Sequence, residues 1–538
     1  MQTLCVVPKF YSTMLSCIIY NVVICSILYI VVDSDSSTFR AAVYEHAVII
    51  PVERKAWVDR STALENMMKN FEIYKVQAEI AGKQNVNILV FPEDGLFGMG
   101  FSRAGLESYL EYIPDPNEKW NACNFPDKYE NTEIQRKLSC VAKENSLYLV
   151  VNMGDRQSCN STNDTKCPLD GHYQFNTDVV YNPKGELIAK YHKINLFYEK
   201  QFDTPPVSDI VTFDTPFGKF AMFTCFDILF KTPALDSLKI QGVGNVVFPT
   251  AWMDALPLLA AIQFHSAFAA GSKVNFLAAN INRPSFRFHG SGIYSPEGYG
   301  AFHYSETHGG KLLIANLSVL QNSNFITQDI YTTPTYELES HNQSSQFNSY
   351  VFHDLFTFVP LTKAMGNISV CNGKLCCHLK YERSNGGSEN YAFGAFDGLH
   401  TYEGVYYIQV CTLLKCKSSS KNSCGEPVKT ASSSFTNLKM TGTFGTPYIF
   451  PEILLTDHGT LKLSFGNSWS YDNGTLQSDR GFELPVINVG MFARDYRLDE
   501  DIEPVRDDGT NIAFNCKLSI FVTIFVYIFI SSSTVFGK

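Results

Sequence analysis

Residues 220–227 read Phe220-Ala221-Met222-Phe223-Thr224-Cys225-Phe226-Asp227, a short run of mostly apolar residues that ends in a lone thiol. The run predicts a buried strand that leads into a turn, with Cys225 at the strand end. A strand end beside loops is a place where a rigid scaffold can hold a reactive group. The nearest cysteines along the chain are Cys167 and Cys371. Because free cysteine is among the most buried residue types, the stretch alone fits either a structural thiol or a nucleophile with partners elsewhere.

Strands and helices alternate around this stretch, which predicts an α/β domain whose sheets are covered by helices. Apolar runs predict strands at residues 39–51, 87–91, 147–153, 178–181, 211–213, 220–224, 246–248 and 275–279. Helices are expected through residues 64–78, 133–145 and 258–270. After about residue 310 the segments become short and β-rich, starting with Lys311 to Leu317. We therefore expect an α/β domain at 38–310 and a mainly β domain at 311–505.

Both ends of the chain are apolar, and each suggests a targeting segment. The early stretch VVICSILYIVV has the length of a signal-peptide core, which predicts a leader at residues 1–35; an uncleaved membrane anchor is the alternative. Near the other end, small residues at Asp508 and Gly509 precede a short apolar run at 518–530 that has no basic tail. That order predicts a glycolipid-anchor signal at 509–538, and a plain membrane-spanning helix is the alternative.

The cysteine count agrees with export. Of the 15 cysteines, four lie in the leader and the tail, and setting Cys225 aside leaves ten that can form five disulfides in an oxidising compartment. These are Cys123, Cys140, Cys159, Cys167, Cys371, Cys376, Cys377, Cys411, Cys416 and Cys424. Zinc binding is the alternative, but paired C-x-x-C spacings with histidines are missing, so no metal is expected. The Asn-x-Ser/Thr sequons, which are candidate glycan sites in an exported chain, are at Asn160, Asn163, Asn316, Asn342, Asn367 and Asn473.

The charge of the chain limits its possible partners, and the targeting signals indicate its location. The net charge is −10 and the chain has no block of Lys and Arg, whereas nucleic-acid binding needs such clusters, so no nucleic-acid partner is expected. A leader and an anchor signal together predict a protein on the extracellular face of the cell membrane, held there by a glycolipid. A secreted protein is the alternative.

Two further motifs complete a set of polar side chains at strand ends. F-P-E-D-G ends the second predicted strand and contains Glu93, and Y-H-K-I-N-L-F contains Lys193. With F-T-C-F-D around Cys225, the motifs occur in the order Glu, Lys, Cys, and the chain resembles the nitrilase superfamily, in particular its vanin and biotinidase branch. The resemblance covers roughly residues 38 to 500. It implies an αββα sandwich followed by a smaller, disulfide-containing, β-rich domain.

The resemblance also implies an amidase that acts on a small-molecule amide without a cofactor. Cys225 is expected to attack the amide carbonyl and form a thioester, and Glu93 to act as general base and general acid. Lys193, with the backbone N–H of Phe226, is expected to stabilise the oxyanion. The Lys193 ammonium is also expected to lower the pKa of the Cys225 thiol below its ordinary value of about 8.5.

Other residues compete for these roles. Lys190 is the rival for the lysine position, but it lacks the N-L-F context that follows Lys193. His192 and His265 allow a Cys–His protease hypothesis, although neither local protease signature is present. Trp252 follows a predicted strand and either lines the acyl pocket or packs in the core.

Three functions remain open at this point. The resemblance implies hydrolysis of pantetheine to pantothenate and cysteamine, and the alternative amide substrate is biocytin, which yields biotin and lysine. A catalytically silent surface glycoprotein is the remaining class, but such a protein has no need of a carboxylate, an ammonium and a thiol together.

Overall fold

The first sheet of the protein is buried on both faces, and the side chains of its strands alternate between these faces. The computed structural model describes residues 37–320, 345–384 and 389–499. The sheet has the order β12-β1-β2-β3-β4-β5. Its strands are β1 (Thr38–Glu45), β2 (Ile88–Val90), β3 (Tyr148–Ser158), β4 (His172–Tyr181), β5 (Leu187–His192) and β12 (Lys311–Ser318). On β1, Ala41 and Val43 join one core and Ala42 and Tyr44 the other, as the two-residue period of a strand requires.

A second six-stranded sheet packs against the first. Its order is β11-β10-β9-β8-β7-β6. The strands are β6 (Val211–Thr215), β7 (Gly218–Met222), β8 (Val243–Thr250), β9 (Asn275–Asn280), β10 (Ser291–Ser295) and β11 (Gly298–His303). Val90 and Val150 of the first sheet share a core with Met222 and Val246 of the second, so the two inner faces are packed together.

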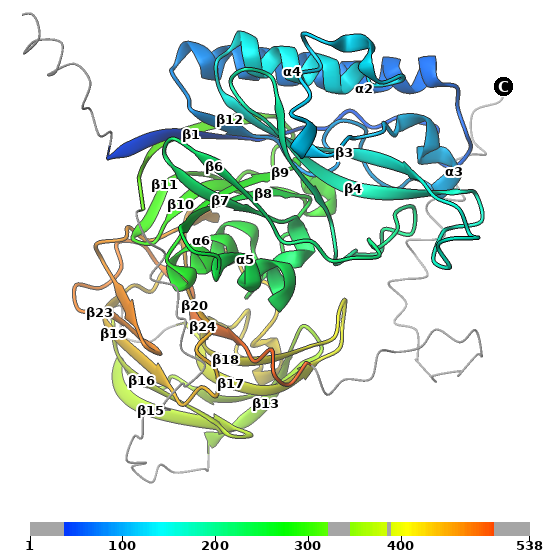
Figure 1. Cartoon of the computed structure of the whole chain (residues 1–538). Helices are drawn as coiled ribbons and strands as arrows, with labels where there is room; N and C mark the ends of the chain where they lie inside the picture. Colours follow the sequence, from blue (N-terminus) through cyan, green and yellow to red (C-terminus); the bar gives the residue numbers. More distant parts are fainter. Residues whose placement is uncertain (1–36, 321–344, 385–388, 500–538) are drawn as a thin grey trace, which may run out of the picture. The chain divides into compact units, whose positions relative to one another are not determined.

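Helices cover the outer face of each sheet (Figure 1). On the first sheet lie α2 (Arg60–Lys83) and α4 (Glu133–Glu144), and Met67 and Phe71 of α2 pack with Leu138 of α4 in the outer core. On the second sheet lie α5 (Asp236–Leu238) and the longer α6 (Ala261–Ser272). The order of layers is helix, sheet, sheet, helix, which confirms the expected αββα sandwich.

The remaining helical segments are short and lie in the connections. They are α3 (Arg103–Leu106), η1 (Glu107–Tyr109), η2 (Pro116–Glu118), η3 (Pro126–Lys128), η4 (Cys225–Leu229), η5 (Lys231–Leu235), η6 (Pro284–Phe286) and η9 (Lys421–Ser423). Of these, η4 bears on function because it starts at the lone thiol directly after β7.

One strand belongs to a different region from the one expected. The segment Lys311 to Leu317 was expected to open the β domain, but β12 pairs antiparallel with β1 along its whole length and closes the edge of the first sheet. The reason is physical: the edge of β1 offers free hydrogen-bonding groups, and a β-rich segment pairs with whichever edge is within reach. The grouping of this strand with the second domain was therefore wrong.

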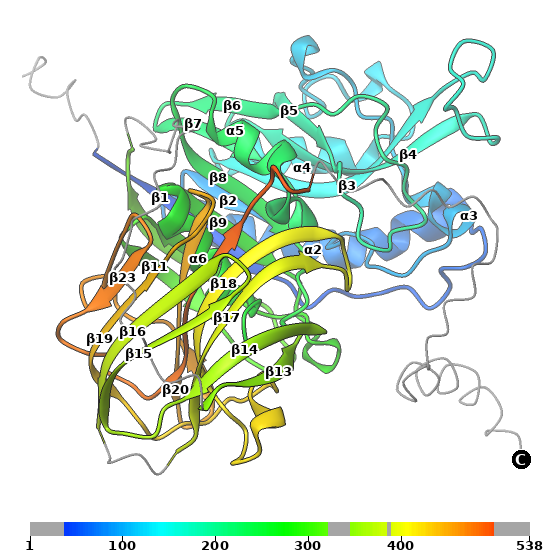
Figure 2. The same ribbon diagram turned by 90° about the horizontal axis from the view of Figure 1, so that it is seen from below.

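The β-rich part of the chain forms two further sheets, which Figure 2 shows as two layers. The seven-stranded sheet has the order β13-β14-β17-β18-β24-β20-β21 and the five-stranded sheet β15-β16-β19-β23-β22. Strands of the first are β13 (Phe347–Val351), β14 (Asp354–Pro360), β17 (Tyr391–His400), β18 (Tyr406–Lys415), β24 (Val486–Arg494), β20 (Ile449–Asp457) and β21 (Thr460–Lys462). Strands of the second are β15 (Met365–Asn372), β16 (Leu375–Arg383), β19 (Phe435–Gly442), β23 (Thr475–Ser478) and β22 (Ser470–Asp472).

Helix α6 joins this β-rich part to the α/β part. Phe268 of α6 stacks on Phe450 of β20 with ring centroids 5.2 Å apart, and Phe264 meets Phe492 edge to face. Gly271 permits the close approach, because a Cβ there would lie 2.5 Å from the backbone oxygen of Ile449. The described residues up to Tyr496 belong to one compact unit, so the two parts pack directly on each other.

The ten cysteines expected to pair form five disulfides. The pairs are Cys123–Cys140, Cys159–Cys167, Cys371–Cys376, Cys377–Cys411 and Cys416–Cys424. Among the described residues Cys225 is the free cysteine. The adjacent residues Cys376 and Cys377 face opposite ways: Cys376 bonds across the β15–β16 hairpin, and Cys377 bonds to β18 of the other sheet.

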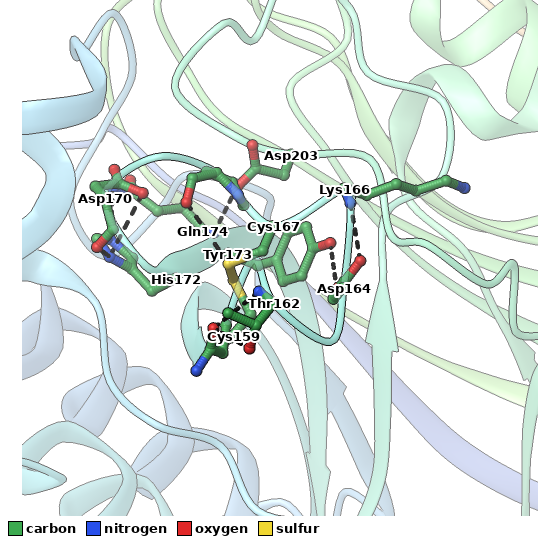
Figure 3. Close-up of a disulfide and its surroundings, with 12 residues drawn as sticks. Cys159, Thr162, Asp164, Lys166, Cys167, Asp170, His172, Tyr173, Gln174 and Asp203 are labelled. Carbon is green, nitrogen blue, oxygen red and sulfur yellow. Dashed lines mark hydrogen bonds and ion pairs between the residues drawn. A yellow bond between two sulfur atoms is a disulfide. The ribbon is translucent and has the colours of Figure 1, made fainter.

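The β3–β4 loop is closed by the Cys159–Cys167 disulfide (Figure 3). The loop also carries two sequons. Asn160, Asn163, Asn316, Asn367 and Asn473 are all exposed, whereas Asn342 lies outside the described residues. Glycosylation at these positions stays a prediction. The segments 1–35 and 509–538 also lie outside the described residues, and within the described part no helix is long and apolar enough to cross a membrane.

Candidate active site

Three side chains predicted from the motifs stand just beyond strand ends. Glu93 follows β2 and Lys193 follows β5, both in the first sheet, and Cys225 follows β7 in the second. Because the two sheets pack face to face, strands from both can deliver side chains to a shared cavity. All three side chains line one cavity of about 590 Å³.

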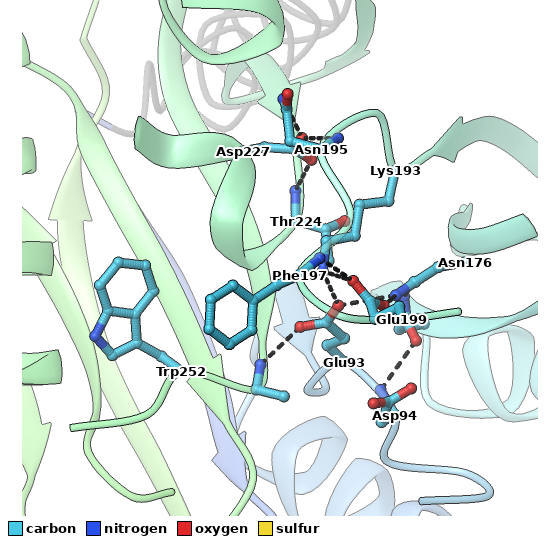
Figure 4. Close-up of polar contacts among 12 residues, drawn as sticks. Glu93, Asp94, Asn176, Lys193, Asn195, Phe197, Glu199, Thr224, Asp227 and Trp252 are labelled. Atoms are coloured by element: carbon cyan, nitrogen blue, oxygen red, sulfur yellow. Dashed lines mark hydrogen bonds and ion pairs between the residues drawn. The ribbon is translucent and has the colours of Figure 1, made fainter. Parts of the chain in front are cut away.

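Lys193 is buried and held by two carboxylates (Figure 4). Its Nζ donates to Glu93 Oε1 at 2.6 Å and to Glu199 Oε2 at 2.5 Å. Burial alone would lower the pKa of Lys193, but the charges of Glu199 and Glu93 outweigh burial and raise the pKa well above its ordinary value. The side chain is therefore an ammonium, and two of its three donors are already occupied.

Glu93 is fixed on both oxygens. Asn176 Nδ2 donates to Oε1 at 2.8 Å, and the backbone N–H of Ala251 donates to Oε2 at 2.8 Å. Asn176 also donates to Glu199 Oε1 at 2.7 Å, so the two carboxylates share an amide as well as an ammonium. A carboxylate that accepts several hydrogen bonds keeps one orientation.

Cys225 sits at a strained point of the backbone. Its φ of 47° lies in the left-handed region, which non-glycine residues seldom adopt and which is found at active sites. The residue is 7% exposed. Cys225 follows β7 and lines the cavity that also contains Glu93 and Lys193.

The thiol is protonated at rest, contrary to the expectation from the sequence. Burial and then the negative charge of Glu93 raise the pKa of Cys225 well above its ordinary value, and the Lys193 charge offsets only part of this. The expected net lowering of the Cys225 pKa was therefore wrong, although the contribution of Lys193 to this pKa has the expected sign. The reason is that burial of the thiol, and then the charge of Glu93, outweigh the charge of Lys193, and no motif spacing reveals this balance.

The turn that carries Cys225 is held from behind by Asp227. This carboxylate accepts from Thr224 N at 3.1 Å, from Asn195 N at 2.9 Å and from the Tyr191 hydroxyl at 2.7 Å. Burial raises the pKa of Asp227 to about 6. Since Tyr191 and Asn195 flank Lys193 in sequence, the same contacts tie the lysine loop to the cysteine turn.

A second, smaller cavity also reaches Cys225. Its volume is about 80 Å³, and Phe226 and Trp252 line it. The Trp252 indole also stacks on Phe264 and donates its Nε1–H to Leu259 O at 2.9 Å. The core-packing alternative for Trp252 is confirmed, and the residue also lines the smaller cavity at the thiol. Its role in an acyl pocket stays a prediction.

The rival residues lie elsewhere. Lys190 donates to Ile113 O at 2.8 Å, and His192 is 2.7 Å from Asp155 Oδ2. His265 is fully buried in an aromatic cluster with no hydrogen-bond partner among the described residues. None of the three lines either cavity at Cys225, so the structure brings Lys193, and not Lys190 or the histidines, to the thiol.

Three polar groups of the site were not predicted from the sequence: Glu199, Asn176 and the backbone N–H of Ala251. Glu199 lies six residues after Lys193 in a loop, and an acid so near a buried lysine was a signal that could have been used. Asn176 is inside a ten-residue buried strand, where nothing marks it as polar support. Among the described residues, no group of three or more His, Cys, Asp or Glu side chains is arranged to hold a metal ion.

A buried carboxylate, ammonium and thiol on an αββα sandwich define the class of carbon–nitrogen hydrolases, and the comparison with known families agrees. Residues 41–271 match the family model described as carbon-nitrogen hydrolase. Residues 345–499 match the model described as vanin C-terminal domain. The two matches together cover both structural parts of the chain.

Relatives narrow the class to one family. The chain is 46% identical to the pantetheinase of Bos taurus over 480 residues, covering 88% of this chain and 93% of the relative. It is 39% identical to the biotinidase of Mus musculus, covering 88% and 97%. An amidase structure from Nesterenkonia sp. is 18% identical and covers 52% of this chain and 90% of its own, with a TM-score of 0.36. The chain belongs to the vanin family of carbon–nitrogen hydrolases, and it is a hydrolase that acts on amides.

Proposed function

We propose that the protein is a pantetheinase, which hydrolyses the amide bond of pantetheine to pantothenate and cysteamine. The observation that carries the proposal is the contact of Lys193 with Glu93 in the cavity that contains the Cys225 thiol. The identity of 46% to a pantetheinase over most of the chain supports pantetheine as the substrate.

The first half of the reaction forms a thioester. Because the thiol is protonated at rest, Glu93 takes its proton as the sulfur attacks the amide carbonyl. The negative charge moves to the carbonyl oxygen, where the third N–H of Lys193 and the backbone N–H of Phe226 stabilise it; one such donor is worth about 3–4 kcal/mol in other enzymes. Glu93 then gives the proton to the amine, and the C–N bond breaks to release cysteamine.

The second half reverses the roles. Water enters, Glu93 takes one of its protons, and the oxygen attacks the thioester carbonyl. The same two donors stabilise the second tetrahedral oxyanion, the C–S bond breaks, and the thiol regains a proton from Glu93. Glu199 and Asn176 act as positioning residues, because they hold Lys193 and Glu93 through both halves.

The test measures pantetheine hydrolysis by the wild-type protein and three variants, one of which is a control. The purified protein should hydrolyse pantetheine, and Cys225→Ser should lose several orders of magnitude of kcat while its circular dichroism stays the same. Lys193→Ala should lose about 10²–10³-fold, because it removes an oxyanion donor, whereas Lys190→Ala serves as control and should retain activity. A Cys225→Ser rate above about a tenth of wild type would show that the thiol is not the nucleophile.

Biotinidase activity is the second candidate, and the 39% identity to a biotinidase is the observation in its favour. Biocytin is therefore assayed beside pantetheine under the same conditions. A higher kcat/KM for biocytin than for pantetheine would replace the proposed substrate and leave the mechanism as described. Turnover of neither amide would favour the silent surface glycoprotein.

We also propose that the enzyme is exported and held at the outer cell surface by a glycolipid. Two features support this: five disulfides, which persist in oxidising compartments, and the order of small residues and short apolar run at the end of the sequence.

A further inference from the structure

The narrow cavity beside Cys225 has walls from both parts of the chain. From the α/β part, Cys225, Phe226 and Trp252 line it. From the β-rich part, the turn between β17 and β18 contributes Tyr402, Glu403 and Tyr406. The β-rich part therefore takes part in forming the surface that a substrate meets next to the thiol.

The β17–β18 turn, residues 400–406, is held in one conformation. The ring of His400 lies 2.7 Å from Asp354 Oδ2 through Nδ1 and contacts the carbonyl oxygen of Tyr402 through Nε2. The Tyr402 ring packs on His353 with centroids 4.1 Å apart. Both nitrogens of His400 are thus engaged within the turn and its neighbouring strand.

The turn also presses closely on the residue that follows the thiol. Gly404 has φ of 141°, and a Cβ there would lie 2.9 Å from Cζ of Phe226 and 2.9 Å from Cε1 of Tyr406. The buried Arg494 donates to Leu229 O at 2.8 Å and lies 4.8 Å above the Tyr406 ring. These contacts hold the turn against η4. They therefore fix the distance between the two walls of the cavity.

Size and charge decide what this cavity can hold. At about 80 Å³ it is much smaller than the 590 Å³ cavity that also reaches Cys225. Among the described residues that line it, Glu403 is the one acid and none is lysine or arginine. A carboxylate would meet the charge of Glu403 with no lysine or arginine among the lining residues to offset it, whereas a short apolar group or a thiol would contact aromatic rings.

We propose that the β17–β18 turn is a specificity determinant: with Phe226 and Trp252 it forms the subsite for the amine half of the substrate, admits a short uncharged group and rejects one that carries a carboxylate. The inference rests on the proposed function, because it assigns the larger acyl half to the larger cavity. Cysteamine, with two carbons and a thiol, suits the narrow cavity. Lysine, the amine half of biocytin, is longer and bears a carboxylate.

The charge test uses two substrates that share the pantothenoyl group. Pantetheine carries cysteamine, and pantothenoylcysteine carries the same amine with one added carboxylate. The wild-type enzyme should prefer pantetheine in kcat/KM. Glu403→Gln should reduce this preference about tenfold, which corresponds to about 1.4 kcal/mol, and Glu403→Lys should reduce it further by supplying a cation. Glu382→Gln, an exposed position on β16, serves as the matched control and should leave the preference unchanged.

The size test is independent of charge. Tyr402→Ala should widen the cavity and raise kcat/KM for pantothenoyl-hexylamine, a long uncharged amide, relative to pantetheine. A merely structural role of the turn would lower both rates together. If the substrate preference is the same in wild type, Glu403→Gln, Glu403→Lys and Tyr402→Ala, the turn does not select the amine and the proposal is overturned.

The same series separates this inference from the proposed function. If the enzyme accepts biotinyl amides and not pantothenoyl amides, the assignment as a pantetheinase fails. Biotinyl-cysteamine and biotinylcysteine then replace the first pair, and the effect of Glu403→Lys on their ratio still decides whether the turn selects the amine half.

Discussion

At the scale of single residues, the ionisation of the site explains why three groups are needed. A thiol beside a free ammonium would be a thiolate and would need no base. Here burial and the charge of Glu93 raise the pKa of Cys225 by more than Lys193, which is paired with Glu93 and Glu199, lowers it, so the thiol keeps its proton until substrate arrives. Glu93 then has two opposed effects: its charge disfavours the thiolate at rest, and its basicity removes the proton during attack.

These opposed effects predict that two variants change thiol reactivity in opposite directions. Glu93→Gln removes the charge that raises the pKa of Cys225, so iodoacetamide should alkylate the thiol at lower pH than in wild type. Lys193→Ala removes the charge that lowers this pKa, so alkylation should require higher pH. Amide turnover should fall in both, by about 10²–10⁴-fold for Glu93→Gln.

The measurement is alkylation rate against pH for wild type and both variants, with Lys190→Ala as control. A Glu93→Gln profile displaced to higher pH would contradict the electrostatic account, because the carboxylate would then be stabilising the thiolate.

At the scale of elements, helix α6 packs against both the second sheet and the β-rich part, and it carries a buried histidine. His265 is packed edge to face against Phe248 and Trp252, and burial lowers its pKa to about 3. Its unfolded form binds a proton below about pH 6.5 and its folded form does not until about pH 3. Folding stability is therefore lost as the pH falls from 6.5, by about 1.4 kcal/mol for each pH unit.

Replacing this histidine should make the enzyme less sensitive to acid. His265→Phe keeps an aromatic ring in the cluster and removes the titration, so at pH 5 it should gain about 2 kcal/mol relative to its effect at neutral pH. Some acid sensitivity should remain, since burial also lowers the pKa of His46 and His289 to about 4. Urea unfolding at pH 5 and pH 7.5 measures the difference, with the exposed His308→Gln as control. An equal effect at both pH values would contradict the prediction.

The elements near the site could be predicted because their patterns are local. Residues 220–223, at the end of β7, and 276–279, within β9, are apolar runs, and the Glu93 and Cys225 motifs each end or follow such a run. Contacts made across the fold could not be predicted. Asn176 lies in the middle of a buried strand, and the partner of β12 is more than two hundred residues away on β1, so neither leaves a periodic signal.

At the scale of the whole molecule, a buried polar network ties the two parts together. Gln263 of α6 donates to Glu452 Oε2 at 2.9 Å and to Asn488 Oδ1 at 2.8 Å. Burial raises the pKa of Glu452 well above its ordinary value, which keeps this carboxyl neutral at the junction. Arg494, on the same strand β24 as Asn488, contacts Leu229 of η4 and the Tyr406 ring, so the β-rich part is a structural component of the cavity.

Attachment to the cell is a property of the whole chain, and it is directly testable. Treating intact cells with a phosphatidylinositol-specific phospholipase should release pantetheine-hydrolysing activity into the medium, because the proposed anchor is a lipid and not a spanning helix. Gly509→Leu should reduce surface display by removing a small residue near the attachment point. Retention of the protein on cells that release a known lipid-anchored control would favour a spanning segment.

The two adjacent cysteines of β16 form disulfides with two different strands. Cys376 lies opposite Cys371 in the hairpin, and Cys377 points inward to Cys411. A slip of one residue in the pairing of β16 would turn each thiol to the other face. Neither bond could then close, so oxidation succeeds for both cysteines when the strand is in its native alignment. The two bonds together therefore fix the alignment of β16 against both β15 and β18.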